Sequence, residues 1–169
     1  AGFATLCLPF NVTLPEGMLA YDLSVENIAG GDAEGKYKAT MKVVAKAGEI
    51  LKKGTPVIIK AEEGSYSLRI TMSDNGAKTS LAGSLLRGNF VKQDLAQCTT
   101  AKKYIFGIVD KVVGFYLMDE SATIDANKCW MEWEMPAEAN VRSFVIRFGG
   151  GETTDIEEVE MEPVRPVLQ

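Results

Sequence analysis

The sequence of 169 residues contains no histidine, which excludes several kinds of chemistry at once. Catalysis by serine–histidine or cysteine–histidine pairs, histidine metal sites and histidine pH switches all need the imidazole ring. The three cysteines form no Cys-x-x-Cys pair, and no hydrophobic run approaches the roughly 20 residues of a membrane-spanning helix. We therefore predict no metal site, no cofactor and no transmembrane segment.

The chain also lacks the excess of positive charge that a nucleic-acid-binding surface needs. The net charge of −5 comes from 23 acidic and 18 basic residues. From Glu152 onward there are six acids and one base, so 17 of each remain in residues 1–151. A neutral body offers no basic surface for a phosphate backbone, and we predict no nucleic-acid partner.

Hydrophobic residues make up 46% of the chain, and they recur with a period of two rather than 3.6. Residues 36–45 and 66–72 alternate between polar and apolar side chains, which is typical of strands with one face on a core. The fold class we predict is all-β: a two-sheet antiparallel β-sandwich, jelly-roll or Ig-like, with about nine strands and at most one short helix. The candidate strands are 2–8, 18–28, 36–45, 56–61, 66–72, 103–109, 112–118, 128–135 and 144–148.

Turn residues punctuate these segments at short intervals. Asp110-Lys111 separates two apolar runs by two residues, which predicts a tight hairpin, and Asp74-Asn75-Gly76 predicts a turn. The segment 80–98 lacks alternation, and its role is left open. Ser80 is a candidate N-cap for a short helix that would end at Gly88.

The domain organisation we expect is a sandwich over 1–149, followed by an acidic, flexible linker over 150–169. Three consecutive glycines interrupt the pattern at 149–151, and the acidic tail after them is poor in aromatic residues. The chain begins Ala1-Gly2 rather than with Met, which we interpret as processing or excision from a longer protein.

Several stretches resemble a known module, the C-terminal β-sandwich of secreted and surface proteins of Bacteroidetes. That module is appended to leucine-rich-repeat proteins, proteases and adhesins, and it precedes a C-terminal sorting element. The stretches that carry the resemblance are Gly2–Leu6 with Pro9-Phe10, 15–17 with Ala20-Tyr21, 54–60, 64–66, 112–116, 126–130, 142–144 with Phe148-Gly149, and 153–159. Cys129 and Trp130 depart from the family pattern, and the sorting element is absent.

The resemblance implies a non-catalytic accessory or adhesion-type module, not an enzyme, of an exported bacterial surface protein. Such a module acts as a spacer or interaction domain, secreted or held at the outer face of the outer membrane. Its partners would be other domains of the same polypeptide, a glycan or a host protein. The family supplies no catalytic residues.

One strand, 128–135, holds the most informative side chains. Alternation places Cys129, Met131, Trp133 and Met135 on one face, and Trp130, Glu132 and Glu134 on the other. Trp133 is then a core residue. An exposed Trp130 beside acidic residues would suit a carbohydrate- or host-ligand-binding surface. The alternative is that Trp130 pairs across strands with an aromatic residue such as Tyr116, or lies under a loop.

Further hypotheses remain open beside these. Glu132 and Glu134 are spaced as a glycosidase pair would be, although solvated strand charges explain them as well. Asp119, Glu120 and Asp125 could contribute oxygen ligands to a calcium ion. A third functional alternative is a protease inhibitor or pro-segment that uses 80–98.

The cysteines leave several alternatives too. Cys7 and Cys129 lie in apolar runs and read as small buried residues, while only Cys98, near Lys102 and Lys103, lies in a basic context that would activate a thiol. Whether any two of Cys7, Cys98 and Cys129 form a disulfide stays open.

Overall fold

The computed structural model describes residues 2–27, 37–136, 140–146 and 158–164, which form an all-β, antiparallel sandwich. No helix occurs in these ranges, and the predicted all-β sandwich is confirmed, although the described residues form fifteen strands rather than about nine. The strands are β1 (Gly2–Leu6), β2 (Val12–Thr13), β3 (Leu19–Asn27), β4 (Tyr37–Ala45), β5 (Ile50–Leu51), β6 (Val57–Ala61), β7 (Arg69–Ile70), β8 (Leu86–Gly88), β9 (Gln93–Ala96), β10 (Lys102–Val109), β11 (Val112–Leu117), β12 (Ser121–Ile124), β13 (Cys129–Trp133), β14 (Ser143–Ile146) and β15 (Glu158–Val164).

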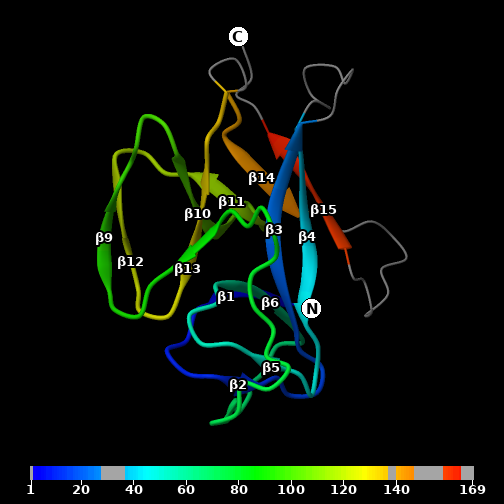
Figure 1. Ribbon diagram of the computed structural model, residues 1–169. Coiled ribbons are helices and arrows are strands. Elements are labelled where there is room, and N and C mark those ends of the chain that lie inside the picture. The colour runs from blue at the N-terminus through cyan, green and yellow to red at the C-terminus, as the bar shows by residue number, and fades with distance from the viewer. Residues whose placement is uncertain (1, 28–36, 137–139, 147–157, 165–169) are drawn as a thin grey trace.

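Ten strands form one long sheet in the order β1-β6-β3-β4-β15-β14-β11-β10-β13-β8. The sheet folds back on itself, because strands near its two ends, β6 and β13, both send side chains into the same buried cluster. Figure 1 shows β3 and β4 side by side through the middle of the molecule. The paired strands β9 and β12 lie to one side of them, and β2 and β5 lie at the lower end.

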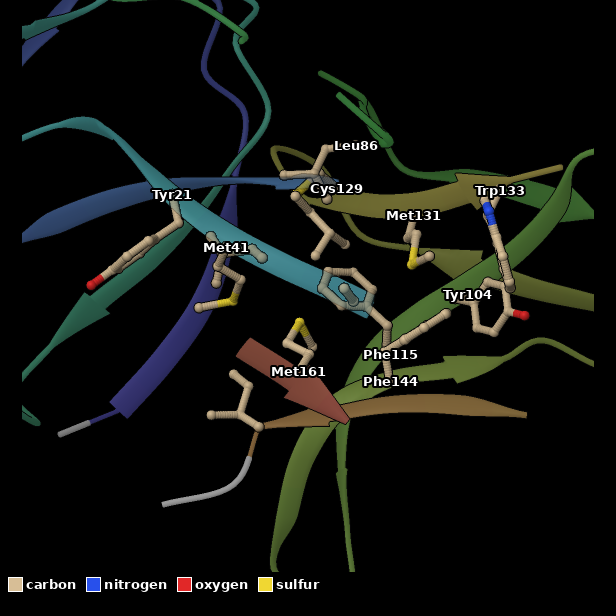
Figure 2. Packing of buried hydrophobic residues seen from close by; sticks show 14 of the residues in the cluster. Tyr21, Met41, Leu86, Tyr104, Phe115, Cys129, Met131, Trp133, Phe144 and Met161 are labelled. Carbon is tan, nitrogen blue, oxygen red and sulfur yellow. The ribbon is translucent and has the colours of Figure 1, made fainter. Parts of the chain in front are cut away.

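The largest buried cluster, here called the main core, lies between the two halves of the folded sheet. Trp133 contacts Tyr37 and Phe144 edge to face, with ring centroids 5.4 and 5.3 Å apart. Such aromatic contacts stabilise the folded chain beyond the apolar area that they bury. Figure 2 shows Phe115, Met131 and Met161 pointing into the same space.

Two smaller clusters lie outside the main core. One gathers under the three-stranded sheet β5-β2-β7 and includes Val12, Leu14 and Val57. The other, here called the ribbon cluster, consists of Leu95, Met118, Ile124 and Trp130. It holds the β9–β12 pair against the outer face of the long sheet, because β9 and β12 contribute Leu95 and Ile124 while β13 contributes Trp130.

The predicted hairpin at Asp110-Lys111 is confirmed. Val109 pairs with Val112 across a two-residue turn, and Asp110 and Lys111 both have positive φ, 50° and 66°. Positive φ at both central residues is the signature of the turn whose twist matches that of a hairpin. This hairpin joins β10 to β11 in the half of the sheet that carries β13.

The prediction for 66–72 is wrong in extent. Only Arg69 and Ile70 form a strand, β7, at the edge of the three-stranded sheet. Ile70 is 56% exposed and Met72 is 97% exposed, and of the alternating residues Leu68 alone packs against a buried cluster. The alternation is present in the sequence, but no other layer of the described residues covers Ile70 and Met72.

The short helix proposed after Ser80 is also wrong. The backbone N–H of Leu81 donates to Asp22 Oδ2 at 2.8 Å, and that of Leu85 donates to the Leu23 carbonyl at 2.9 Å. A helix would pair the Leu85 N–H with the Leu81 carbonyl, whereas here β3 accepts it instead. The chain then enters β8, which pairs with β13.

The tail is the largest correction. A linker over 150–169 was expected, yet residues 158–164 form β15 between β4 and β14, inside the long sheet. Met161 is 2% exposed and belongs to the main core. The segment is acidic, which predicts a linker, but its polarity alternates as in a strand. Glu158, Glu160 and Glu162 alternate with less polar residues. Residues 150–157 and 165–169 lie outside the described part of the chain.

Candidate functional site

The outer face of β13 was the predicted ligand surface, and the alternation along this strand is confirmed. Cys129, Met131 and Trp133 face the main core. Trp130 belongs instead to the ribbon cluster on the opposite face of the strand. The two tryptophans therefore stabilise two different layers of the molecule.

Trp130 is buried, as the alternative to an exposed ring predicted, although a pair of strands covers it rather than a loop. Its side chain is 6% exposed beneath β9 and β12, against Leu95 and Ile124. The indole Nε1 donates to Glu132 Oε1 at 3.0 Å, which satisfies the polar atom of the buried ring. A sugar-stacking platform needs an exposed ring face, so the interpretation of Trp130 as such a platform is wrong.

The other predicted site residues do not meet around a cleft. Glu132 lies 3.9 Å from Arg87 Nε in addition to its bond with Trp130. Glu134 follows the end of β13 and is exposed. Tyr116 lies on β11, which β10 separates from β13, and its hydroxyl donates to the Val112 carbonyl. Glu132 thus has a structural role beside Trp130, and Tyr116 does not pair with Trp130.

A different feature, the groove beside β1, offers a better surface for a ligand. It is a hollow of about 430 Å³ between β1, β6 and the segment that follows β6. Its lining is mostly apolar, and it includes Ala4, Leu6, Met18, Ile59, Tyr66 and Leu68. β1 is the terminal strand of the long sheet and pairs only with β6 among the described strands.

The rim of the β1 groove is polar. Glu62 and Glu63 lie at its edge with Tyr66, whose hydroxyl donates to the Glu62 carbonyl at 2.6 Å, and Lys128 lines it as well. An apolar floor with a few polar groups is the usual composition of a binding site. The sequence does not reveal this groove, because Leu6, Ile59 and Leu68 are far apart in the chain and have the pattern of core residues.

The thiol of Cys98 differs from those of Cys7 and Cys129. The Thr100 hydroxyl, 3.3 Å from the sulfur, and the backbone amides of Thr100 and Ala101 stabilise the thiolate. Together with the charge of Lys103, they lower the pKa of Cys98 from 9.0 to about 7. Burial raises the pKa of Cys7, and it raises that of Cys129 to about 12. The sequence predicted that neighbouring lysines would activate Cys98, and the charge of Lys103 is the weakest of the causes that lower its pKa.

Oxygen ligands for a metal are not gathered anywhere in the described ranges: no group of three or more cysteine, aspartate or glutamate side chains lies together there. Asp119, Glu120 and Asp125 do not converge. The turn at Asp74 is confirmed, because the Ala77 N–H donates to the Asp74 carbonyl at 3.0 Å and Gly76 has a φ of 73°.

The segment 80–98 is built into the fold rather than projecting from it. Leu86 belongs to the main core and Leu95 to the ribbon cluster. Between them, the buried Asn89 side chain donates to the Val91 and Asp125 carbonyls and accepts from the Lys128 N–H. Phe90 and Val91 are exposed at the turn. A protease-inhibiting loop would need a longer free segment, so this alternative loses its support.

In the described ranges, no helix has the length and apolar character needed to cross a bilayer. Comparisons of the chain with protein-family models, curated proteins and solved structures find no match.

Proposed function

We propose that this chain is a non-catalytic interaction module of an exported bacterial surface protein. The observation that carries the proposal is the β1 groove, an apolar hollow beside a terminal strand with charged residues at its rim. The buried acid of β3, Asp22, accepts three hydrogen bonds that hold the local structure. Cys7 and Cys129 are buried with raised pKa values, so their thiols are poor nucleophiles.

The partner that fits the groove is an extended peptide segment of a neighbouring domain. Residues 5–7 lie against residues 127–129, so residues 2–4 are the part of the terminal strand that would accept an added strand. Alternate side chains of the added strand would enter the apolar hollow. Glu62 and Glu63 favour a basic residue at one end of the bound segment. The export and surface location rest on the resemblance to the Bacteroidetes module, and fractionation of the producing cells tests them.

Selection of displayed peptides on the purified chain tests the interaction. We expect enrichment of peptides with alternating apolar residues and a lysine or arginine. Ala4→Arg should abolish capture because it places a long cation in the groove, while Ala96→Arg, at an exposed position of β9, should leave it intact. No enrichment, or enrichment that ignores Ala4→Arg, would contradict the proposal.

A second measurement separates peptide binding from glycan binding. Thermal unfolding in the presence of a panel of soluble polysaccharides should leave the melting temperature unchanged. A rise of several degrees with any glycan would favour the carbohydrate-binding alternative instead, since a ligand that binds the folded state stabilises it.

A further inference from the structure

The two buried cysteines lie where the first strand of the long sheet meets the opposite end of that sheet. The Cys7 N–H donates to the Asn127 carbonyl at 3.0 Å, and the Cys129 N–H donates to Thr5 Oγ1 at 3.4 Å. Residues 5–7 therefore run alongside residues 127–129. β1 begins the strand order and β13 is next to its other end, so this contact is the seam of the folded sheet.

Gly88 leaves room for the Cys7 side chain at the seam. A Cβ atom at position 88 would lie 2.4 Å from Cys7 Sγ and 2.7 Å from Cys7 Cβ, so the Cys7 side chain fills the space of the missing one. Gly88 is also the direct cross-strand partner of Cys129. Side chains at such paired positions have Cβ atoms about 5 Å apart. Cys7 is thereby placed beside Cys129, whose thiol donates to the Val57 carbonyl.

We propose that Cys7 and Cys129 form a disulfide bond that fastens the seam between β1 and β13. The three thiols are free in the structure, and this pair is the one that the fold brings together. Cys98 belongs to the segment between β9 and β10 and bonds Thr100 instead. Both proposed partners are 3% exposed, so the bond would be buried and protected from reductants.

The oxidation requires a disulfide as oxidant, either a small-molecule disulfide such as oxidised glutathione or a protein disulfide. One cysteine thiolate attacks the oxidant to form a mixed disulfide and releases one thiol. The second cysteine then attacks the mixed disulfide and releases the other. Two cysteine thiols are oxidised, one disulfide is reduced to two thiols, and the two protons pass to the released thiols.

The bond should form during folding rather than afterwards. Burial in the folded chain raises the pKa of both thiols and excludes an oxidant from them. In the unfolded chain both thiols are accessible and ionise at ordinary pH values. The bond would close a loop of about 120 residues, a length at which a crosslink restricts the unfolded chain strongly.

Refolding the reduced, full chain in a mixture of oxidised and reduced glutathione tests this inference. We expect a product lighter by two hydrogen atoms, a peptide map that joins Cys7 to Cys129, and one alkylatable thiol, Cys98, after denaturation. The melting temperature should exceed that of the reduced chain by about 10 °C.

Cys98→Ser is the matched control and should leave both the crosslink and the increase in melting temperature unchanged. Three alkylatable thiols after refolding, or a disulfide that includes Cys98, would overturn the inference. A crosslink that forms without raising the melting temperature would overturn its role as a fastening. Because the map is made on the unaltered chain, the result does not depend on whether Cys7→Ser or Cys129→Ala variants fold.

Discussion

At Gly114 of β11, the absence of a Cβ atom allows the neighbouring strand β14 to pack closely. A Cβ atom there would lie 2.4 Å from the Phe144 carbonyl oxygen and 2.9 Å from the Val145 Cα, both backbone atoms of the adjacent β14. Backbone in a paired strand cannot move aside as a flexible side chain can. Gly114 therefore permits the close approach of two central strands.

Gly114→Ala should lower the free energy of unfolding by about 2–3 kcal/mol, because it forces β11 and β14 apart. Gly107 is its direct partner on β10, and a Cβ atom there meets nothing within 4 Å. Gly107→Ala should stay within about 0.5 kcal/mol of the parent. Urea unfolding of the two variants measures both values, and equal losses would contradict this account.

The thiol of Cys98 provides a second prediction for a single residue. Because hydrogen bonds lower its pKa to about 7 in the folded state, its alkylation rate should reach half its maximum near pH 7. At pH 7.5 the folded chain should thus react faster at Cys98 than the unfolded chain does, where the thiol ionises near 9. Thr100→Val should move the midpoint upward. A midpoint near 9 in the folded parent would refute the prediction.

At the scale of elements, one carboxylate fixes the segment between β7 and β8. Asp22 of β3 is 3% exposed; its oxygens accept from the N–H of Leu23 and Leu81 and from the Ser84 hydroxyl. A buried carboxylate is stable only when donors surround it. These bonds tie residues 81–84 to β3.

Asp22→Leu should lower the free energy of unfolding by about 2–4 kcal/mol, because it leaves the Leu81 N–H without its acceptor and removes charge-assisted bonds. Ser84→Ala removes one donor only and should cost about 1 kcal/mol. Hydrogen exchange at the Leu81 amide gives a local measurement. Unchanged protection of this amide in Asp22→Leu would contradict the role assigned to the carboxylate.

Local sequence patterns predicted those elements whose partners are near in the chain. The Asp110-Lys111 turn follows from two residues between apolar runs, and the inward side of β13 follows from alternation. Local patterns could not predict which residues cover the outward side of β13. Trp130 is buried there by β9 and β12, and the positions of these strands depend on the whole fold. For the same reason the β1 groove could not be predicted, since its lining joins residues from four separate stretches.

At the scale of the whole molecule, β15 joins the two halves of the long sheet. It pairs with β4 on one side, Met161 with Ala39, and with β14 on the other, Met161 with Ile146. All three of these side chains are buried. Without β15, two strands in the middle of the sheet would lack a hydrogen-bonded neighbour.

A chain that ends at residue 157 should therefore lose its cooperative thermal unfolding transition, because it lacks β15 and the Met161 contribution to the main core. A chain that ends at residue 164 retains this strand and should unfold like the parent. Circular dichroism at increasing temperature distinguishes the two. A sharp transition in the shorter chain would show that residues 158–164 are dispensable.

The position of β15 also sets the order of events as the polypeptide is made. The last described strand is inserted at the centre of the sheet, whereas β3 and β4 are synthesised long before it. Until residue 164 leaves the ribosome or crosses a membrane, β4 and β14 both keep an unpaired edge open to other chains. The long sheet is consequently completed only once residue 164 is available, and until then these two edges favour association with other chains.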